Sequence, residues 1–217
     1  GQGQVVDRFS GDYINAMALC DETHRVYIGL SSKKIVVYDT ETTQKICEVS
    51  EAHSKGIYGL KIAPAGHDVS IVTCSADNTI KTWKFDEEAK ELRAVATIHQ
   101  FDGAEEDVLR QLLNVICFEE DGQLKTIGVN LQGDIVTSSN GAPSGSTSGQ
   151  KDKLDALVAG PDGSIYYASE TCVFALRNAV STRVAGVTTN QKMDVLVANE
   201  HSVYACSNTG YVHKING

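Results

Sequence analysis

The chain has 217 residues, 41% of them hydrophobic, and a formal net charge of −9. This composition excludes disorder as the main state and suffices for one large or two small domains. Nucleic acid and anionic membranes are not expected as partners, because carboxylates outnumber basic side chains and no broad cationic surface is available to phosphates. No apolar run is long enough to span a membrane, and the first residues do not resemble a secretory signal. We therefore expect a cytoplasmic protein.

The cysteines and histidines do not have the spacing of a metal or redox site. Neighbouring cysteines are at least 27 positions apart, unlike the close pairs of zinc and thiol-redox motifs. They are Cys20, Cys47, Cys74, Cys117, Cys172 and Cys206. We expect buried, reduced thiols, no metal and no cofactor.

The segment Ala52–Lys84 is the clearest structural unit in the chain. Turn residues separate three segments with the apolar pattern of strands, residues 57–63, 70–75 and 79–83. Three antiparallel strands joined by hairpins are therefore predicted. The unit resembles a WD-repeat, whose third strand ends in Trp-Asp; here Trp83 is followed by Lys84.

The pattern of this third strand recurs along the chain. Four other segments align with it and end at Tyr38, Ser138, Leu176 and Ile215, so that the end positions are on average about 44 residues apart. A four-stranded propeller blade takes about 40–45 residues. The aligned β-branched residues are Ile35, Ile80, Ile135, Val173 and Val212. One such match is easily a coincidence, but five in register indicate a repeat.

Outer strands are predicted after the third strand of three units, over residues 44–49, 92–98 and 180–187. The third unit is followed by Ser139–Gly149, which is poor in apolar residues and predicts a flexible loop or a degraded outer strand. The last unit lacks an outer strand, whereas Val5–Phe9 is an apolar segment without a nearby hairpin partner. We expect these two to pair and close a ring, since an open sheet edge promotes aggregation.

Together the patterns predict an all-β fold, a WD-repeat β-propeller of about five four-stranded antiparallel blades. It would form a closed ring or part of a seven-bladed propeller. The expected single domain, residues 1–217, has repeat units at about 10–49, 53–98, 112–149, 153–187 and 192–217, with residues 1–9 as the closing strand. A β-sandwich with regularly spaced strands is the alternative fold.

Five residues of the clearest unit combine side chains that invite a chemical interpretation: His53, Thr73, Ser75, Asp77 and Trp83. A histidine, a carboxylate and a hydroxyl are the ingredients of nucleophilic catalysis. The resemblance to WD-repeats implies instead that hydrogen bonds among them lock one blade, since an unpaired member would cost about 1–3 kcal/mol. Because the sequence also lacks a phosphate-binding glycine loop and a nucleophile elbow, we expect no catalytic residues and no enzyme.

The longest interval between repeats contains an acidic insertion. Its carboxylates are Asp102, Glu105, Glu106 and Asp107. One interpretation is an acidic lip on a propeller face that binds a basic partner. The other is a solvated loop or a single helical turn. Calcium binding is not indicated, because the spacing is not that of a calcium loop.

A narrower resemblance rests on the order of several short motifs. They are Glu120–Leu124, Ser148–Gln150, Lys153–Asp155, Ala159–Gly163 and the blade end Val173–Leu176. Over about residues 50–177 this order is similar to the second propeller of the actin-interacting protein 1 family. That family has two seven-bladed propellers, whereas about five units are found here. Its actin contacts are attributed mostly to the first propeller, so no contact residue can be transferred to this chain.

The resemblance implies a cytoplasmic, cytoskeletal protein without enzymatic activity that binds F-actin together with cofilin and promotes filament disassembly. The alternative is a generic WD-repeat scaffold or adaptor for another multiprotein complex. In the first case, the acidic insertion would meet the more basic surface of cofilin.

Overall fold

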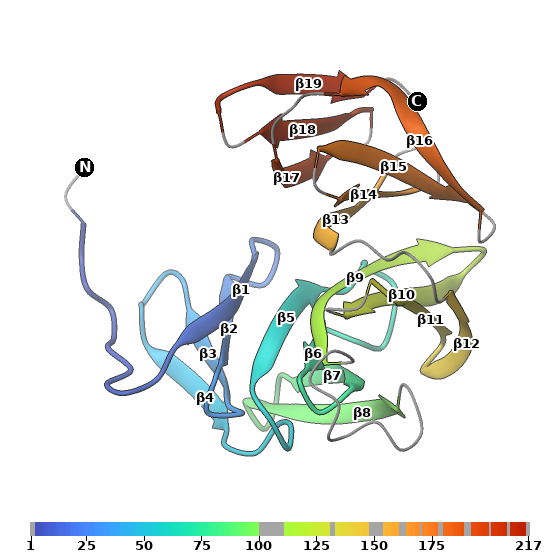
Figure 1. The fold of residues 1–217 in the computed structure, drawn as a ribbon. Helices are drawn as coiled ribbons and strands as arrows, with labels where there is room; N and C mark the ends of the chain where they lie inside the picture. Colours follow the sequence, from blue (N-terminus) through green and yellow to red (C-terminus); the bar gives the residue numbers. More distant parts are fainter. Residues whose placement is uncertain are drawn as a thin grey trace. The chain divides into compact units, whose positions relative to one another are not determined.

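The computed structural model describes residues 3–99, 111–130, 133–147, 154–160, 164–169, 171–177, 180–188, 192–199, 201–207 and 209–215. Over these residues the protein is all-β, with 19 strands in five antiparallel sheets and no helix (Figure 1). No segment of this part of the chain is therefore a helix that could cross a membrane. Strands that are neighbours in a sheet are also neighbours in sequence, so each sheet is a meander of hairpins and resembles a propeller blade.

The strands follow the predicted repeat closely. The first sheet contains β1 (Ile14–Cys20), β2 (Arg25–Leu30), β3 (Ile35–Asp39) and β4 (Lys45–Val49). The second contains β5 (Ile57–Ile62), β6 (Ile71–Ser75), β7 (Thr79–Asp86) and β8 (Glu91–His99). The third contains β9 (Leu112–Glu120), β10 (Gln123–Asn130), β11 (Ile135–Ser139) and β12 (Ala142–Thr147). The fourth contains β13 (Leu154–Ala159), β14 (Ile165–Ser169), β15 (Cys172–Arg177) and β16 (Val180–Thr188), and the fifth β17 (Met193–Ala198), β18 (Val203–Ser207) and β19 (Val212–Ile215).

The chain forms two compact units. One contains residues 1–128 and 136–145, and the other residues 129–135 and 146–217. In the first unit, one core cluster joins the facing sides of the first two sheets, with Tyr27, Ile35, Ile57 and Trp83 among its buried members. A second cluster, which includes Cys74, lies between β6 and β9. Alternate residues of a strand point to opposite faces, so β6, whose five residues are all buried, is covered on both sides.

The second unit has its own apolar core. Tyr166, Val173, Met193 and Val203 are buried there, from the fourth and fifth sheets. The small residue Ala205, also fully buried, allows close approach of the two sheets. The face-to-face packing of consecutive sheets thus occurs within each unit.

A backbone feature recurs before the third strand in four of the five sheets. The residue two positions before the aligned β-branched residue has a left-handed backbone, with φ of 74° at Lys33, 62° at Asn78, 82° at Gly133 and 91° at Gly210. In each case its N–H donates to the carbonyl of the residue three positions earlier. This is a three-residue hairpin loop with a left-handed third position. The repeat therefore extends from the strands to the turns.

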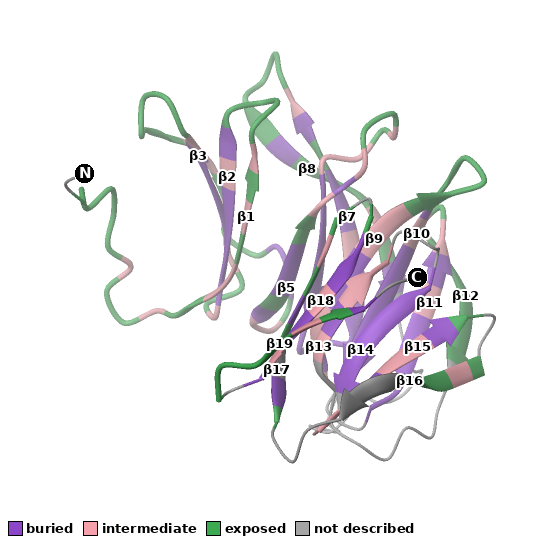
Figure 2. Ribbon diagram, turned by 90° about the horizontal axis from the view of Figure 1, so that it is seen from above, coloured by how far each residue is buried: buried purple, intermediate pink, exposed green. Residues whose placement is uncertain are grey.

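The segment after β11 is an outer strand and not a loop over residues 142–147. The expectation of a degraded outer strand is confirmed there, and the flexible loop is wrong. The hairpin turn is Asn140-Gly141, with φ of 47° and 81°, the turn that two-residue hairpins favour. This turn lets a strand form although its residues 142–146 are exposed (Figure 2).

The prediction that Val5–Phe9 is a strand is wrong. Residues 3–9 belong to no strand. Phe9 packs instead beside the apolar cluster on the first sheet, and the hydroxyl of Tyr38 donates to the carboxylate of Asp7. Phe9 and Asp7 thus contact a face of the first sheet, whereas Val5 and Val6 are largely exposed. The fifth sheet has three strands among the described residues.

Candidate functional site

The five residues singled out in the repeat at residues 53–98 lie together within the second sheet. His53 precedes β5, Thr73 and Ser75 are on β6, Asp77 is in the β6–β7 turn and Trp83 is on β7. Nε2 of His53 is 2.8 Å from Oγ1 of Thr73, and Nδ1 of His53 is 3.0 Å from Oδ2 of Asp77. The indole N–H of Trp83 donates to Oγ1 of Thr73 at 2.8 Å. A continuous hydrogen-bonded chain therefore runs from Trp83 to Asp77.

The direction of these hydrogen bonds follows from the donors. The indole N–H can only donate, so the Thr73 oxygen accepts from Trp83. Assigned from this network, the Thr73 hydroxyl donates to Nε2 of His53, and Nδ1–H of His53 donates to Asp77. A neutral histidine satisfies every step of this chain.

Asp77 is the centre of the network. Its carboxylate also accepts from the Ser54 N–H at 2.9 Å and from the N–H and hydroxyl of Thr79 at 3.0 and 2.6 Å. Burial raises the pKa of Asp77, but the hydrogen bonds that its carboxylate accepts from His53, Thr79 and the Ser54 N–H outweigh burial and hold this pKa well below its ordinary value. The carboxylate is therefore ionised in the folded protein.

Ser75 forms hydrogen bonds with the backbone around Asp77. Its hydroxyl donates to the carbonyl of Gly56 at 2.8 Å and accepts from the N–H of Asp77 at 3.1 Å. Thr79 was not predicted from the sequence, although a hydroxyl two residues after an aspartate in a turn is a recognisable local pattern. Ser75 and Thr79 fix the turn that positions Asp77.

The arrangement suits a structural brace and not nucleophilic catalysis at these residues. Thr73 has no exposed surface and His53 is 2% exposed, so neither side chain can reach a substrate in solution. The Thr73 hydroxyl is engaged by both Trp83 and His53. Hydrogen bonds inside a core of low polarity hold such groups in one geometry.

The lowered pKa of Asp77 makes the stability of the protein depend on pH. A carboxylate with a lowered pKa in the folded state stabilises it fully above its ordinary pKa of about 4, by about 1.4 kcal/mol for each unit of difference. That contribution is lost as the pH falls toward the lowered value. We expect the Asp77→Asn variant to be less stable than wild type at pH 7, by a margin that shrinks from about pH 5 to pH 3.

Urea denaturation across this pH range measures the margin. Asp121→Asn, which removes a carboxylate at the exposed β9–β10 turn, is the matched control and should lower the stability at pH 7 much less than Asp77→Asn does. A pH-independent margin for Asp77→Asn would contradict the role assigned to its carboxylate.

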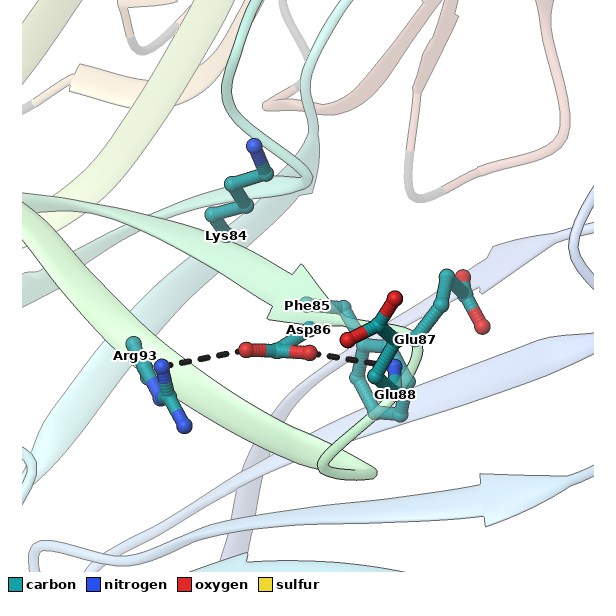
Figure 3. A pocket seen from close by; sticks show the side chains of 6 residues that line it. All are labelled: Lys84, Phe85, Asp86, Glu87, Glu88 and Arg93. Atoms are coloured by element: carbon teal, nitrogen blue, oxygen red, sulfur yellow. Dashed lines mark hydrogen bonds and ion pairs between the residues drawn. The ribbon is translucent and has the colours of Figure 1, made fainter.

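A surface pocket of about 460 Å³ lies beside the β7–β8 turn (Figure 3). Several of its charged lining residues form ion pairs: Asp86 with Arg93 at 3.0 Å, Glu87 with Arg25 of β2 at 2.6 Å, and Lys84 with Asp68. The Arg25 guanidinium also lies 3.8 Å from the centre of the Phe85 ring. The contacts of Arg25 with Glu87 and Phe85 join the first and second sheets.

Within the described ranges, no group of three or more His, Cys, Asp or Glu side chains is arranged to hold a metal ion. All six cysteines are free. Burial raises the pKa of Cys117 to about 12 and raises that of Cys74 as well, which makes both thiols poor nucleophiles. The acidic residues Asp102, Glu105, Glu106 and Asp107 lie outside the described residues.

Fold and site together define an all-β protein with propeller-like blades, one of which is braced by a buried His–Thr–Trp–Asp network. Neither protein-family models nor curated proteins match this sequence.

Proposed function

We propose that the five sheets are blades of a WD-repeat β-propeller and that the protein is a non-enzymatic interaction module. The observation that carries this proposal is the hydrogen-bonded chain from Trp83 through Thr73 and His53 to Asp77. It lies in the sheet whose sequence most resembles a WD-repeat. The packing of consecutive four-stranded sheets through apolar faces supports the same conclusion.

The partner we propose is the cofilin-decorated actin filament, with disassembly of the filament as the outcome. The support is the order of motifs over residues 50–177 that resembles the actin-interacting protein 1 family. Electrostatics adds a condition, since actin is acidic and a chain of net charge −9 gains nothing from long-range attraction to a bare filament. Binding is therefore expected to require cofilin, whose more basic surface would meet the acidic insertion.

Cosedimentation with actin filaments, with and without cofilin, tests this proposal. We expect the protein to pellet with cofilin-saturated filaments at low salt, and to pellet weakly with bare filaments. Changing Asp102, Glu105, Glu106 and Asp107 to the corresponding amides should lower the cofilin-dependent binding severalfold and leave the melting temperature nearly unchanged.

A control variant with the same change in charge carries Asp21→Asn, Glu22→Gln, Glu120→Gln and Asp121→Asn, all exposed and in or next to hairpin turns. It should bind as wild type does. Wild-type protein that stays in the supernatant with cofilin-saturated filaments would contradict the actin proposal and favour a scaffold of another complex.

A further inference from the structure

The turn between β11 and β12 contains an Asn-Gly pair at the surface. Asn140 is exposed, and Asn140 and Gly141 both have a left-handed backbone, with φ of 47° and 81°. Asparagine tolerates this conformation, and glycine adopts it without strain. A Cβ atom at Gly141 would also lie 3.1 Å from that of Ala96 on β8. The fold therefore favours Asn-Gly at these two positions.

The same pair is chemically reactive. Because glycine has no side chain, its backbone nitrogen is accessible to the side-chain amide of a preceding asparagine. When the nitrogen of Gly141 attacks Cγ of Asn140, a C–N bond forms and the Cγ–Nδ2 bond breaks. Nδ2 leaves as ammonia with the proton that Gly141 loses. Water then opens the five-membered ring at either carbonyl, which gives aspartate or isoaspartate at position 140.

The closed hairpin holds Asn140 away from this reaction. The N–H of Asn140 donates to the carbonyl of Leu124 on β10 at 2.9 Å, and the N–H of Leu124 donates to Oδ1 of Asn140 at 3.0 Å. Ring closure requires the side chain to turn toward Gly141 and the backbone of Asn140 to leave the turn conformation. The reacting atoms reach an attack geometry only after these hydrogen bonds break. The reaction therefore requires the hairpin to open.

Strand β12 has few contacts that keep the hairpin closed. It lies at the edge of the third sheet, and its residues 142–146 are exposed. The strand contains proline and glycine and no large apolar side chain. The hydroxyl of Thr137 on β11 donates to the carbonyl of Gly145 at 3.2 Å and accepts from the Ser144 hydroxyl at 3.1 Å. A segment with few buried apolar contacts opens locally at a free energy below that of global unfolding.

We propose that Asn140 is a site of spontaneous deamidation that proceeds through local opening of the β11–β12 hairpin. An aspartate product keeps an acceptor for the N–H of Leu124. An isoaspartate product adds one methylene group to the main chain, so the two-residue turn no longer fits and β12 stays detached from β11. The modification thus converts a transient opening into a lasting one. The inference does not depend on the proposed binding of actin and cofilin.

Peptide mapping by mass spectrometry, after incubation of the full chain at neutral pH, tests the proposal. A synthetic peptide of residues 136–145 gives the rate of reaction outside the fold. We expect Asn140 to react at least about tenfold more slowly in the protein than in the peptide, and faster in urea that leaves the global fold intact. Asn216, which also precedes a glycine, lies outside the described residues and is measured in a separate proteolytic peptide.

Two variants separate local opening from global unfolding. Thr137→Val removes both hydrogen bonds to β12 but keeps the shape of the side chain, so the rate at Asn140 should rise severalfold. Its matched control, Thr97→Val at an exposed position of β8, should react as wild type does. Thr73→Val weakens the brace of the second sheet and should lower the global stability without raising the rate at Asn140.

Limited proteolysis measures whether the opening lasts. Cleavage within residues 142–147 should be severalfold faster for the isoaspartate product than for the Asn140→Asp variant, which keeps the acceptor for Leu124. An isoaspartate product as resistant as that variant would overturn the proposal. So would reaction in the protein as fast as in the peptide, an unchanged rate in Thr137→Val, or a rate in Thr73→Val that rises with the loss of global stability.

Discussion

Replacing Trp83 by alanine is expected to lower the free energy of unfolding by about 3–5 kcal/mol. The indole is 3% exposed and packs in the core cluster between the first and second sheets. Its removal leaves a cavity in that core and takes away the hydrogen bond that the Thr73 hydroxyl accepts. Urea denaturation followed by circular dichroism measures the loss, because Trp83 is the single tryptophan and its fluorescence disappears in the variant.

Two further variants separate the packing of Trp83 from its hydrogen bond. Thr73→Val keeps the shape of the side chain but leaves the indole N–H and Nε2 of His53 without their shared partner, so a loss of about 1–3 kcal/mol is expected. Tyr58→Ala, on β5 of the same sheet, removes an aromatic ring that is 41% exposed and should cost much less. A loss below about 1 kcal/mol for Trp83→Ala would contradict the brace assigned to this residue.

Substituting Gly59 by alanine should destabilise the protein by about 1–3 kcal/mol, the usual cost of overpacking a core. A Cβ atom at Gly59 would lie 2.7 Å from the sulfur of Cys74 and 3.0 Å from the backbone nitrogen of Val115. Val115 belongs to β9, so the second and third sheets approach each other through this glycine. The backbone of β9 cannot yield as the end of a flexible side chain can.

Thermal and urea unfolding of the alanine variant measure this effect. Gly3→Ala is the control, because a Cβ there meets no atom within 4 Å. Adding Cys74→Ala to Gly59→Ala removes the sulfur contact but not the backbone contact, so the double variant should recover part of the overpacking cost. A Gly59→Ala protein as stable as Gly3→Ala would show that β5 and β9 are not packed as described.

Much of the strand pattern could be predicted from the sequence. Strand β3 and the segment 79–83 of β7 have β-branched or apolar residues at the spacing of a strand, and the turn residues beside them set their limits. For Ser139–Gly149 the sequence left a flexible loop and a degraded outer strand open, because the segment is poor in apolar residues. The Asn140-Gly141 turn, which joins β12 to β11, is the local signal that favours the strand.

The members of the brace could also be predicted, because the resemblance of Ala52–Lys84 to a WD-repeat implies hydrogen bonds among them. His53, Thr73, Asp77 and Trp83 all belong to the second sheet or its turns. The contribution of Thr79 was missed, because its hydroxyl gains a role only when Asp77 is turned back over it by the left-handed Asn78. Its sequence signal is the local pattern of a hydroxyl two residues after an aspartate in a turn.

The sequence by itself determined the order of the hairpins and most strand limits, because these depend on residues close in the chain. The members of the brace followed from its resemblance to a WD-repeat. Only the tertiary structure decided which apolar faces are covered. The apolar residues of Val5–Phe9 suit either a strand pairing or packing on a sheet face. In the structure Phe9 packs on the first sheet beside Tyr38, whereas Val5 and Val6 are exposed. The need for glycine at position 59 likewise comes from the backbone at Val115, 56 positions away, which no local pattern encodes.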